Sequence, residues 1–474
     1  MQFRRASLIG SIDWLTVAIY LLLVIIGWVN IYSAGYSEES SSMFDLSQQY
    51  GKQILWIGMA AVLAIFTMSI DQRFFETFAF VIYGFFILLL LSVLFVGIEV
   101  NGAKSWLDFG FVRLQPAEFT KIGTALALAA WMSRYNFNLN NTRDFMLMLG
   151  IVALPMLLIL LQNDMGSVLT YTSFVILFYR RGLSAIYLWM IAIAGLIFVL
   201  VLRFSTIDVF VGIASAVVLV LLYKRLWREV GLYLASAILL VGMWWAGRYF
   251  ALFSLDISVV LYLLIGANAL YWLTKSYLSK LRFYRLLVAF ALGAFLFTSS
   301  VEKVFNLFDD YQQDRILITL GLKSDPYGVE YHVIQSLIAI GSGGFSGKGF
   351  LEGTQTKFDF VPEQTTDFIF STIGEEFGFL GTFTVISLFL FLLIRLLFLA
   401  ERQRSSFSKN YAYGLVGIIF IHFFINIGMV TGIGPVIGVP LPFVSYGGSS
   451  LWSFTLLLFI FLKMDARRME VLSS

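Results

Sequence analysis

The longest segment of this apolar chain that could do aqueous chemistry is a polar, glycine-rich block between Gly321 and Glu376. Its first motif reads SDPYG and has the composition of a turn, because Asp and Pro start turns and Gly ends them. Forming that turn is therefore the ordinary explanation for Asp325. Because the sequence on either side is largely compatible with hydrocarbon, a function should be sought in this block first.

The end of the block carries carboxylates at helical spacing. Asp367, Ser371 and Glu375 recur every four residues, so on a helix they would share one face, with Glu375 about 12 Å from Asp367. Carboxylates at that depth in a membrane cost free energy and normally face a polar cavity. We therefore predict a polar cavity lined by Glu363, Thr366, Asp367, Glu375 and Glu376.

A second polar segment begins with NGAKSW and ends with AEFTK. Trp106 is a natural anchor at a membrane interface. Glu118 and Lys121 have the i, i+3 spacing of a helical ion pair, so an ordinary interfacial loop with a satisfied pair is one interpretation. The other is that Lys104, Arg113 and Lys121 form a cationic rim for an anionic group such as a phosphate.

Two further polar segments interrupt the apolar runs. Asp164, in the sequence QNDMG, could cap the following helix or could partner a cation or metal in a cavity. Residues 432–450 contain three of the seven Pro residues of the chain, so no continuous helix can run through them. Irregular backbone at membrane depth is tolerated only where protein or a water-filled cavity buries it. This segment, which includes Ser445, is therefore either a structural re-entrant hinge or part of the wall of a site.

The composition places these segments in a membrane protein. Of 474 residues, 59% are hydrophobic and 13% are charged, whereas soluble domains carry roughly 25% charged residues. The absence of Cys excludes disulfides, thiolate nucleophiles and thiolate metal sites, and two His residues argue against a His-based metal centre. A net charge of +3 with dispersed basic residues argues against a nucleic-acid partner.

A transmembrane helix needs about 20 mostly apolar residues. Fourteen such runs are predicted near 13–34, 54–70, 74–99, 117–133, 146–162, 166–180, 183–203, 207–223, 230–250, 257–274, 284–301, 367–398, 410–431 and 446–463. With a cytoplasmic N-terminus, most Lys and Arg residues fall on the cytoplasmic side, as the positive-inside rule requires. Both termini would then be cytoplasmic, 302–366 would form one large extracytoplasmic loop, and all four polar segments would lie on the external face.

With these residues in view, the chain resembles the SEDS family (shape, elongation, division and sporulation). The resemblance runs through NGAKSW, RLQPAEFTK, QNDMGS, SDPYGVEYHVIQSLIAIGSGGFSGKGFLEGTQ, FVPEQTTDFIFSTIGEEFG and GPVIGVPLPFVSYGGSS, and GTQ is the form of the rod-shape members. Asn163 stands where the family usually has Pro, so a local backbone change is expected. The family usually has ten spans. The resemblance therefore implies an all-α polytopic helix bundle, a single transmembrane domain over 1–474, with about four extra helices within 183–282.

The resemblance further implies a peptidoglycan glycosyltransferase that polymerises lipid II into glycan strands at the outer face of the bacterial cytoplasmic membrane, during elongation and shape maintenance. Asp325 would be the catalytic base on the acceptor sugar hydroxyl, with inversion at the donor anomeric carbon. The cationic residues would neutralise the pyrophosphate leaving group, and a divalent cation (Mg or Mn) held by carboxylates could share that task. The implied substrate contacts are Lys104, Trp106, Arg113, Glu118, Lys121, Gln335, Ser336, Lys348, Gln355 and Ser445, with Asp164 added to the polar cavity.

The resemblance also implies partners, namely a class B penicillin-binding protein transpeptidase and the elongation machinery. A lipid II flippase is the competing hypothesis. A transporter places its charged groups near the bilayer midplane, often within inverted repeats, whereas here the polar residues gather at one face. A non-enzymatic scaffold is a weaker alternative, since scaffolding does not need buried carboxylates.

Overall fold

The computed structural model describes residues 8–36, 43–100, 102–139, 141–249, 257–306, 308, 310–325, 328–358 and 360–468. The chain forms two compact units. Unit 1 combines Met1–Ser184 with Asp325–Ser474, and unit 2 is Ala185–Ser324. Asn101, Pro326 and Tyr327, which belong to two of the predicted motifs, lie outside the described residues.

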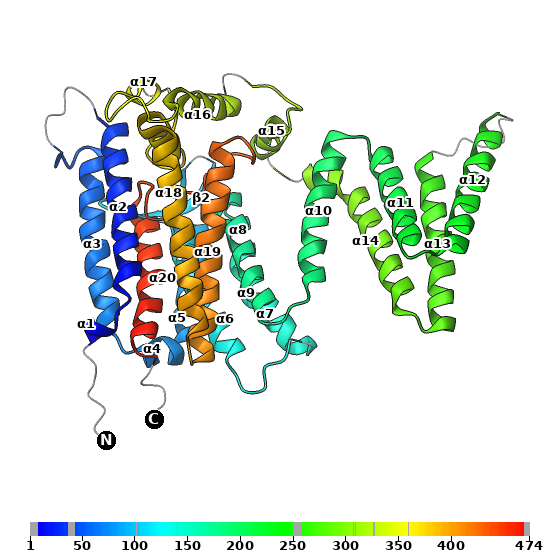
Figure 1. Ribbon diagram of the computed structural model, residues 1–474, viewed down its shortest axis with the longest axis horizontal. Helices are drawn as coiled ribbons and strands as arrows, with labels where there is room; N and C mark the ends of the chain where they lie inside the picture. The colour runs from blue at the N-terminus through cyan, green and yellow to red at the C-terminus, as the bar shows by residue number, and fades with distance from the viewer. Residues whose placement is uncertain are drawn as a thin grey trace. The chain divides into compact units, whose positions relative to one another are not determined.

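Unit 1 is a bundle of apolar helices that contains the four polar segments, except for residues 321–324 at the start of the block at 321–376. Its long helices are α2 (Trp14–Ala34), α3 (Gln49–Ser69), α5 (Ala79–Val96), α6 (Pro116–Met132), α7 (Thr142–Leu160), α18 (Ile369–Glu401), α19 (Ser406–Val430) and α20 (Gly448–Ala466). Its short ones are α1 (Leu8–Ser11), α4 (Gln72–Thr77), α8 (Met165–Thr170), the 3₁₀ turn η1 (Tyr171–Ser173), α9 (Phe174–Arg180), α16 (Val329–Gly343) and α17 (Thr354–Lys357). The last helix, α20, packs against α3 and α6, whereas α18 packs against α2 and α19; α16 and α17 lie across one end of the bundle (Figure 1).

Many helices of unit 1 begin at residues whose side chains satisfy the first free backbone N–H groups. Asp13, Asp71, Asn141, Asp164 and Ser405 each accept a hydrogen bond from a backbone N–H of the helix that follows. For Asp164 this is the capping role that the sequence left open.

Unit 2 contains α10 (Ala185–Arg203), α11 (Thr206–Tyr223), α12 (Trp227–Tyr249), α13 (Ile257–Ser279), α14 (Arg282–Phe305) and α15 (Asp310–Thr319). Aromatic rings hold its core together. Phe210 stacks on Phe295 with ring centroids 4.2 Å apart, and Tyr233 stacks on Trp272 at 5.7 Å. That 183–282 is an insertion into a ten-helix bundle stays a prediction.

Twelve helices within the described residues are long and apolar enough to cross a membrane, which confirms a polytopic helical membrane protein. The predicted count of fourteen is not confirmed. Of the two remaining predicted spans, α6 has 17 residues. The other, at 166–180, is divided into α8, η1 and α9.

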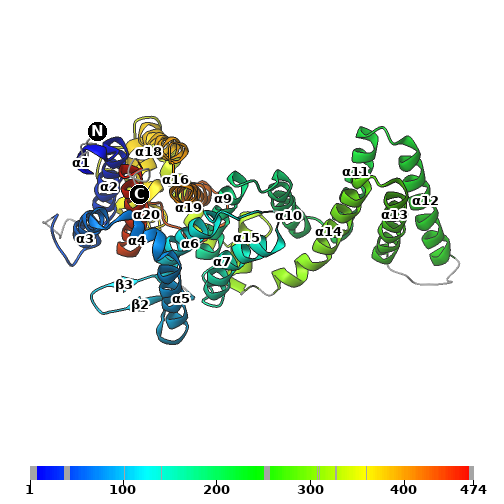
Figure 2. The same ribbon diagram turned by 90° about the horizontal axis from the view of Figure 1, so that it is seen from below.

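A small antiparallel sheet, which the sequence analysis did not predict, lies between α5 and α6. It contains β1 (Ile98–Val100), β2 (Ala103–Asp108) and β3 (Arg113–Leu114), in the order β1-β2-β3. Leu107 pairs with Leu114 and Asp108 pairs with Arg113, so residues 109–112 form the tip of a hairpin. Figure 2 shows the β2–β3 hairpin beside α5, at the edge of the bundle.

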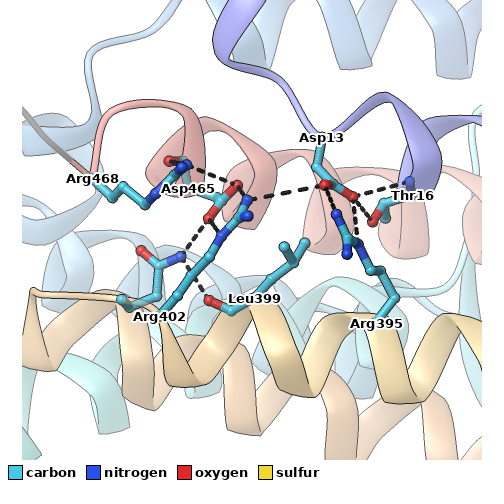
Figure 3. A network of polar contacts seen from close by, with 8 residues as sticks. Asp13, Thr16, Arg395, Leu399, Arg402, Asp465 and Arg468 are labelled. Carbon is cyan, nitrogen blue, oxygen red and sulfur yellow. Dashed lines mark hydrogen bonds and ion pairs between the residues drawn. The ribbon is translucent and has the colours of Figure 1, made fainter.

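At the end of the bundle that holds α1, an ionic network joins α2, α18 and α20 (Figure 3). Asp13 accepts hydrogen bonds from the Thr16 backbone N–H at 3.1 Å and from the Arg395 guanidinium, whose Nε lies 3.2 Å away. Arg402 bridges Asp13, at 4.0 Å, and Asp465. Arg468 lies 3.5 Å from the second carboxylate oxygen of Asp465. Both carboxylates are buried, so the network fixes the positions of three helix ends.

We predict that Asp13→Asn lowers the free energy of unfolding by about 1–3 kcal/mol, because two partly buried guanidinium groups lose a charged acceptor. Burial alone would raise the pKa of Asp13, but hydrogen bonds from Arg395 and Thr16 outweigh it and hold the pKa below its ordinary value. The stabilisation that the ionised Asp13 carboxylate gives the folded state is therefore complete at neutral pH, and it disappears only as the pH falls below about 4. Thermal unfolding in detergent, followed by tryptophan fluorescence at pH 7, measures the loss.

The matched control is Asp71→Asn, since Asp71 also caps a helix but is exposed, and Asn caps equally well. Equal changes in unfolding temperature for the two variants would show that the network adds nothing beyond the cap.

Candidate functional site

The four polar segments meet in one layer of unit 1, as their predicted convergence on one face required. The Tyr446 N–H donates to the Thr365 carbonyl at 2.9 Å and ties the C-terminal segment to the block at 321–376. Ser449 accepts from the Gln115 N–H at 3.2 Å, and the Gln115 side chain donates to Asp164 at 2.9 Å. This layer is the candidate site.

The segment between α19 and α20 is irregular, as its prolines predicted, and its backbone groups are bonded within the protein. Asn426 donates from its amide to the carbonyls of Asp367 and Val439, both at 2.8 Å. Ser445 accepts from the Leu441 N–H at 2.8 Å and donates to the Thr366 carbonyl at 2.6 Å. Ser445 is thus buried and occupied in holding the segment, whereas the resemblance implied contact with substrate.

Asp325 opens a turn that leads into α16, as its motif predicted. Its carbonyl accepts from the Gly328 N–H at 3.1 Å, and its own N–H donates to Glu330 Oε2 at 2.8 Å. A Cβ at position 328 would clash with the Asp325 Oδ2, so any larger residue there would displace the Asp325 carboxylate from its present position. The carboxylate is half-buried, and no donor among the described residues bonds to it.

A break in α18 organises the outer part of the site. Gly378 has φ 61° and ψ −152°, which interrupts the helical hydrogen bonds. The freed carbonyls of Glu375 and Glu376 accept, both at 3.0 Å, from the N–H groups of Lys348 and Gly349. In return, the N–H groups of Phe379 and Leu380 donate to the carbonyls at positions 344 and 345. The segment after α16 therefore replaces the missing helical partners of α18.

Glu375 is fully buried, and protein groups surround its carboxylate. Oε1 accepts from Lys348 Nζ at 2.7 Å and from the Gln355 N–H at 2.9 Å; Oε2 accepts from the Thr356 N–H at 2.9 Å. The two backbone N–H donors, of Gln355 and Thr356, come from the first turn of α17, which a negative charge stabilises. Glu375 therefore holds α17 and Lys348 in place and does not line an open cavity, so the predicted functional role is replaced by a structural one.

Glu376 points to different partners from Glu375. Its Oε1 accepts from the Ser33 hydroxyl on α2 and from the Leu351 N–H at 3.2 Å. Its Oε2 is buried and has no hydrogen-bond partner among the described residues. The two neighbouring carboxylates thus bind the segment after α16 to α18 and to α2. They do not form one common cavity wall.

The predicted carboxylate face over 367–375 is wrong, because α18 begins only at Ile369. Asp367 lies in the preceding turns, where its carbonyl is held by Asn426. Glu363 is exposed and accepts from the Thr366 hydroxyl at 2.9 Å. Neither residue therefore shares a helix face with Glu375.

The predicted cationic rim is not formed as expected, because Lys121 is fully buried. Its Nζ lies 2.7 Å from Glu118 Oε1 and 2.7 Å from His422 Nε2, which confirms the ion pair and adds a third member. An ammonium group only donates, so Nε2 of His422 must accept and the imidazole proton lies on Nδ1. The hydroxyl of Ser453 on α20 approaches Glu118 at 3.5 Å, and the group joins α6, α19 and α20.

The other two predicted rim residues belong to the sheet. Lys104 is half-buried, and its Nζ donates to the Leu94 carbonyl at the end of α5 at 2.8 Å. Arg113 is exposed and pairs with Asp108 at 3.2 Å. Trp106 lies half-buried on β2 opposite Ile98.

The remaining predicted substrate contacts are divided between the protein interior and its surface. Ser336 is buried, bonding Ser371 at 2.7 Å and the Val430 carbonyl at 2.8 Å, so it fixes α16 to α18 and α19. Gln335 and Gln355 are half-buried, and the side-chain oxygen of Gln355 has no partner among the described residues. These two remain able to meet a ligand.

At Asn163, φ is 59°, a conformation that the ring of proline does not allow. The expected local backbone change therefore accompanies the departure from the family motif. Asp164 takes the capping role, at the start of α8, and also accepts from the Gln115 side chain at the start of α6; its alternative role as partner of a cation or metal stays a prediction.

Within the described residues, no three His, Asp or Glu side chains lie close enough together to hold a metal ion. The carboxylates predicted to bind a cation are instead engaged with Lys348, Gln115 or backbone N–H groups. The structure therefore assigns no ligands to the predicted divalent cation.

Sequence reasoning missed His422, Gln115, Ser33 and Gly378. His422 lies 301 residues from Lys121, and no local pattern connects the two. Gly378 gave a weak signal, because a Gly directly after two Glu residues and a Phe can mark a helix break.

Comparison with known proteins identifies the family of this chain. A sequence model of the FTSW_RODA_SPOVE family, described as cell cycle protein, matches residues 13–211 and 210–470. The peptidoglycan glycosyltransferase RodA of Treponema pallidum is 35% identical over 99% of this chain and 100% of its own length. The peptidoglycan glycosyltransferase MrdB of Escherichia coli K12 is 31% identical, over 84% of this chain and 81% of its own.

Solved structures share the fold. A chain of a peptidoglycan synthase complex, described for coordinating polymerization and crosslinking, has a TM-score of 0.61 and 26% identity, covering 96% of this chain and 98% of that one. The rod shape determining protein RodA of Thermus thermophilus has a TM-score of 0.56 at 22% identity, covering 96% and 97%.

We predict that Gly378→Ala lowers the free energy of unfolding by about 2 kcal/mol or more, because its backbone conformation is almost confined to glycine. The added Cβ would also clash with the Gly347 nitrogen and lie 2.9 Å from the carbonyl oxygens of Gly343 and Gly344. Thermal unfolding in detergent measures the effect. The control is Gly150→Ala in α7, where a Cβ meets no atom within 4 Å. An unchanged unfolding temperature for Gly378→Ala would contradict the proposed exchange of hydrogen bonds.

Proposed function

The chain belongs to the FTSW_RODA_SPOVE family of cell cycle proteins, and we propose that it polymerises lipid II into peptidoglycan glycan strands at the outer face of the bacterial cytoplasmic membrane. The observation that carries its activity as a peptidoglycan glycosyltransferase is the full-length similarity to RodA of Treponema pallidum. We also propose a role in cell elongation and shape, with both termini in the cytoplasm; the excess of Lys and Arg residues in the predicted cytoplasmic segments supports this orientation.

In the proposed reaction, Asp325 takes the proton from the acceptor sugar hydroxyl. The hydroxyl oxygen forms the new bond to the donor anomeric carbon with inversion. The bond from that carbon to the pyrophosphate oxygen breaks, and polyprenyl pyrophosphate leaves. The half-buried Asp325 carboxylate, which carries no donor among the described residues, suits this role because it is free to accept a proton.

The layer around Asp325 supports the role by rigidity. Glu330 fixes the Asp325 N–H, and α16 is fastened to α18 and α19 through Ser336. Arg113, 61% of whose side chain is exposed, is the cation of the predicted rim best placed to meet an anionic leaving group. Lys121 could meet it only after leaving Glu118 and His422, so we assign it a positioning role.

We further propose a transpeptidase of the class B penicillin-binding type as partner, within the elongation machinery. The structural likeness to a chain of a peptidoglycan synthase complex supports it.

Asp325→Asn should reduce glycan-strand formation by roughly 100-fold or more, the usual loss when a positioned base is removed. The assay incubates purified protein, with and without a transpeptidase partner, with fluorescent lipid II and resolves products on a gel. The matched control is Asp314→Asn, whose carboxylate pairs with Lys323 at 2.6 Å near the surface of unit 2 and should leave polymerisation unchanged. Undiminished polymer from Asp325→Asn would refute the assignment of the base. Transfer of lipid II across liposomes without any polymer from the unaltered protein would instead favour the flippase.

The divalent cation is a separate proposal without assigned ligands. We expect EDTA to abolish polymer formation by the purified protein, and added Mg²⁺ or Mn²⁺ to restore it, because a divalent ion neutralises a departing pyrophosphate. Full activity in EDTA would remove the cation from the mechanism while leaving the role of Asp325 intact.

A further inference from the structure

The tip of the β2–β3 hairpin carries two large apolar side chains that the fold leaves uncovered. Phe109 is 69% exposed and Phe111 is 74% exposed. The tip is nevertheless well ordered by polar contacts. Asp108 accepts from the Gly110 N–H at 2.7 Å and pairs with Arg113, and the Phe109 N–H donates to the Val112 carbonyl at 3.0 Å. The phenylalanines are therefore held outward by a defined turn.

The base of the hairpin is fixed to the end of a membrane span. Lys104 donates to the carbonyls of Leu94 and Phe95, the last turn of α5, and its own N–H donates to the Gln162 carbonyl. Helix α5 has 18 residues and α6 has 17, which gives lengths of about 27 Å and 26 Å. Both lengths are slightly less than the thickness of a hydrocarbon core, about 30 Å. The sheet between them therefore begins at the membrane boundary and not above it.

The contacts of the hairpin tip are a second, independent indication that the hairpin lies at membrane depth. The Phe111 ring packs edge-on against Trp56 of α3, with centroids 5.9 Å apart. Trp56 lies seven residues after Gln49, where α3 begins, so it is about 10 Å along that span. Gln49 itself contacts Thr365 of the candidate site, so α3 begins on the site side of the membrane. The tip thus lies alongside a span, below its outer end.

The uncovered phenylalanines continue an apolar surface that already faces lipid. Phe95 and Val96, beside the base of the hairpin, are 82% and 72% exposed at the end of a span. Arg113 and Asp108 add a polar edge to the same hairpin. The hairpin thus combines an apolar tip, a neighbouring cation and short strands with unpaired backbone groups. This combination suits the zone between acyl chains and headgroups, where unpaired backbone groups still reach water.

We propose that the β2–β3 hairpin is a membrane-inserted element, whose Phe109 and Phe111 side chains lie among the acyl chains of outer-leaflet phospholipids while Arg113 lies at the level of the lipid phosphates. The hairpin thereby binds the polar segment at residues 101–121 of the candidate site to the lipid surface. This insertion is independent of the proposed activity, since it follows from exposure, helix length and the contact with Trp56.

The absence of Cys from the chain makes the test direct, because one introduced Cys can be labelled uniquely. The variants Phe109→Cys and Phe111→Cys carry a nitroxide spin label in the full-length protein, in vesicles of phosphatidylethanolamine and phosphatidylglycerol. Ile65→Cys is the lipid-facing control, since Ile65 is 72% exposed within α3. Tyr135→Cys is the aqueous control, since Tyr135 is fully exposed between α6 and α7. Collision rates with oxygen, which concentrates in the bilayer, and with a water-soluble nickel chelate are measured by power saturation.

We expect the ratio of oxygen to nickel collisions at 109 and 111 to match that at 65 and to exceed that at 135 several-fold. A ratio equal to that at 135 would overturn the proposal, because the tip would then be in water. Low collision rates with both reagents, together with an immobilised spectrum, would also overturn it, because protein would then cover the tip. A variant counts only if its unfolding temperature matches that of the unaltered protein; where one of the two does not, the other of positions 109 and 111 carries the test.

Discussion

The structure depends on the rule that backbone N–H and C=O groups at membrane depth must find partners inside the protein. Two of the interruptions in the helical backbone of unit 1 lie at Gly378 and between α19 and α20, and each frees backbone groups. Segments from elsewhere in the chain supply the partners, through Lys348 and Gly349 at the first break and through Asn426 at the second. The polar segments converge because they complete one another's hydrogen bonds, and the layer containing Asp325 is the result.

The buried charges serve this same layer. Glu375, Glu376 and Asp164 each accept hydrogen bonds from two or more elements, and the Lys121 group links three helices. Most polar residues predicted to contact substrate are thus bonded to other protein groups and stabilise the fold around the site. Few of them are left free to bind or react with a ligand. Among those expected to act on or contact substrate, Asp325, Arg113, Gln335 and Gln355 retain the exposure needed to meet a ligand.

The sequence predicted features that depend on local properties. Hydropathy placed the spans, prolines placed the irregular segment, and turn chemistry placed Asp325 before α16. Features that depend on distant partners were not predictable. Lys121 was assigned to a rim because His422, which helps bury it, lies 301 residues away. Asp367 was assigned to a helix face because the Asn426 side chain, which holds its carbonyl outside the helix, comes from α19. The β2–β3 hairpin was not predicted because its strands are short and the alternation of buried and exposed residues along them is weak.

The packing of α20 has a consequence for biosynthesis. This helix is the last to emerge, yet it packs against α3, α4 and α6, and Trp452 and Lys463 donate to carbonyls of the α3 residues Trp56 and Met68. Until α20 is inserted, those early spans hold unfilled faces and unpaired polar groups in the bilayer. The N-terminal helices therefore cannot reach their final arrangement while the chain is still growing. The layer of polar segments that forms the candidate site includes the segment directly before α20, so it is completed only at the end of synthesis. An unfinished chain therefore has no assembled site.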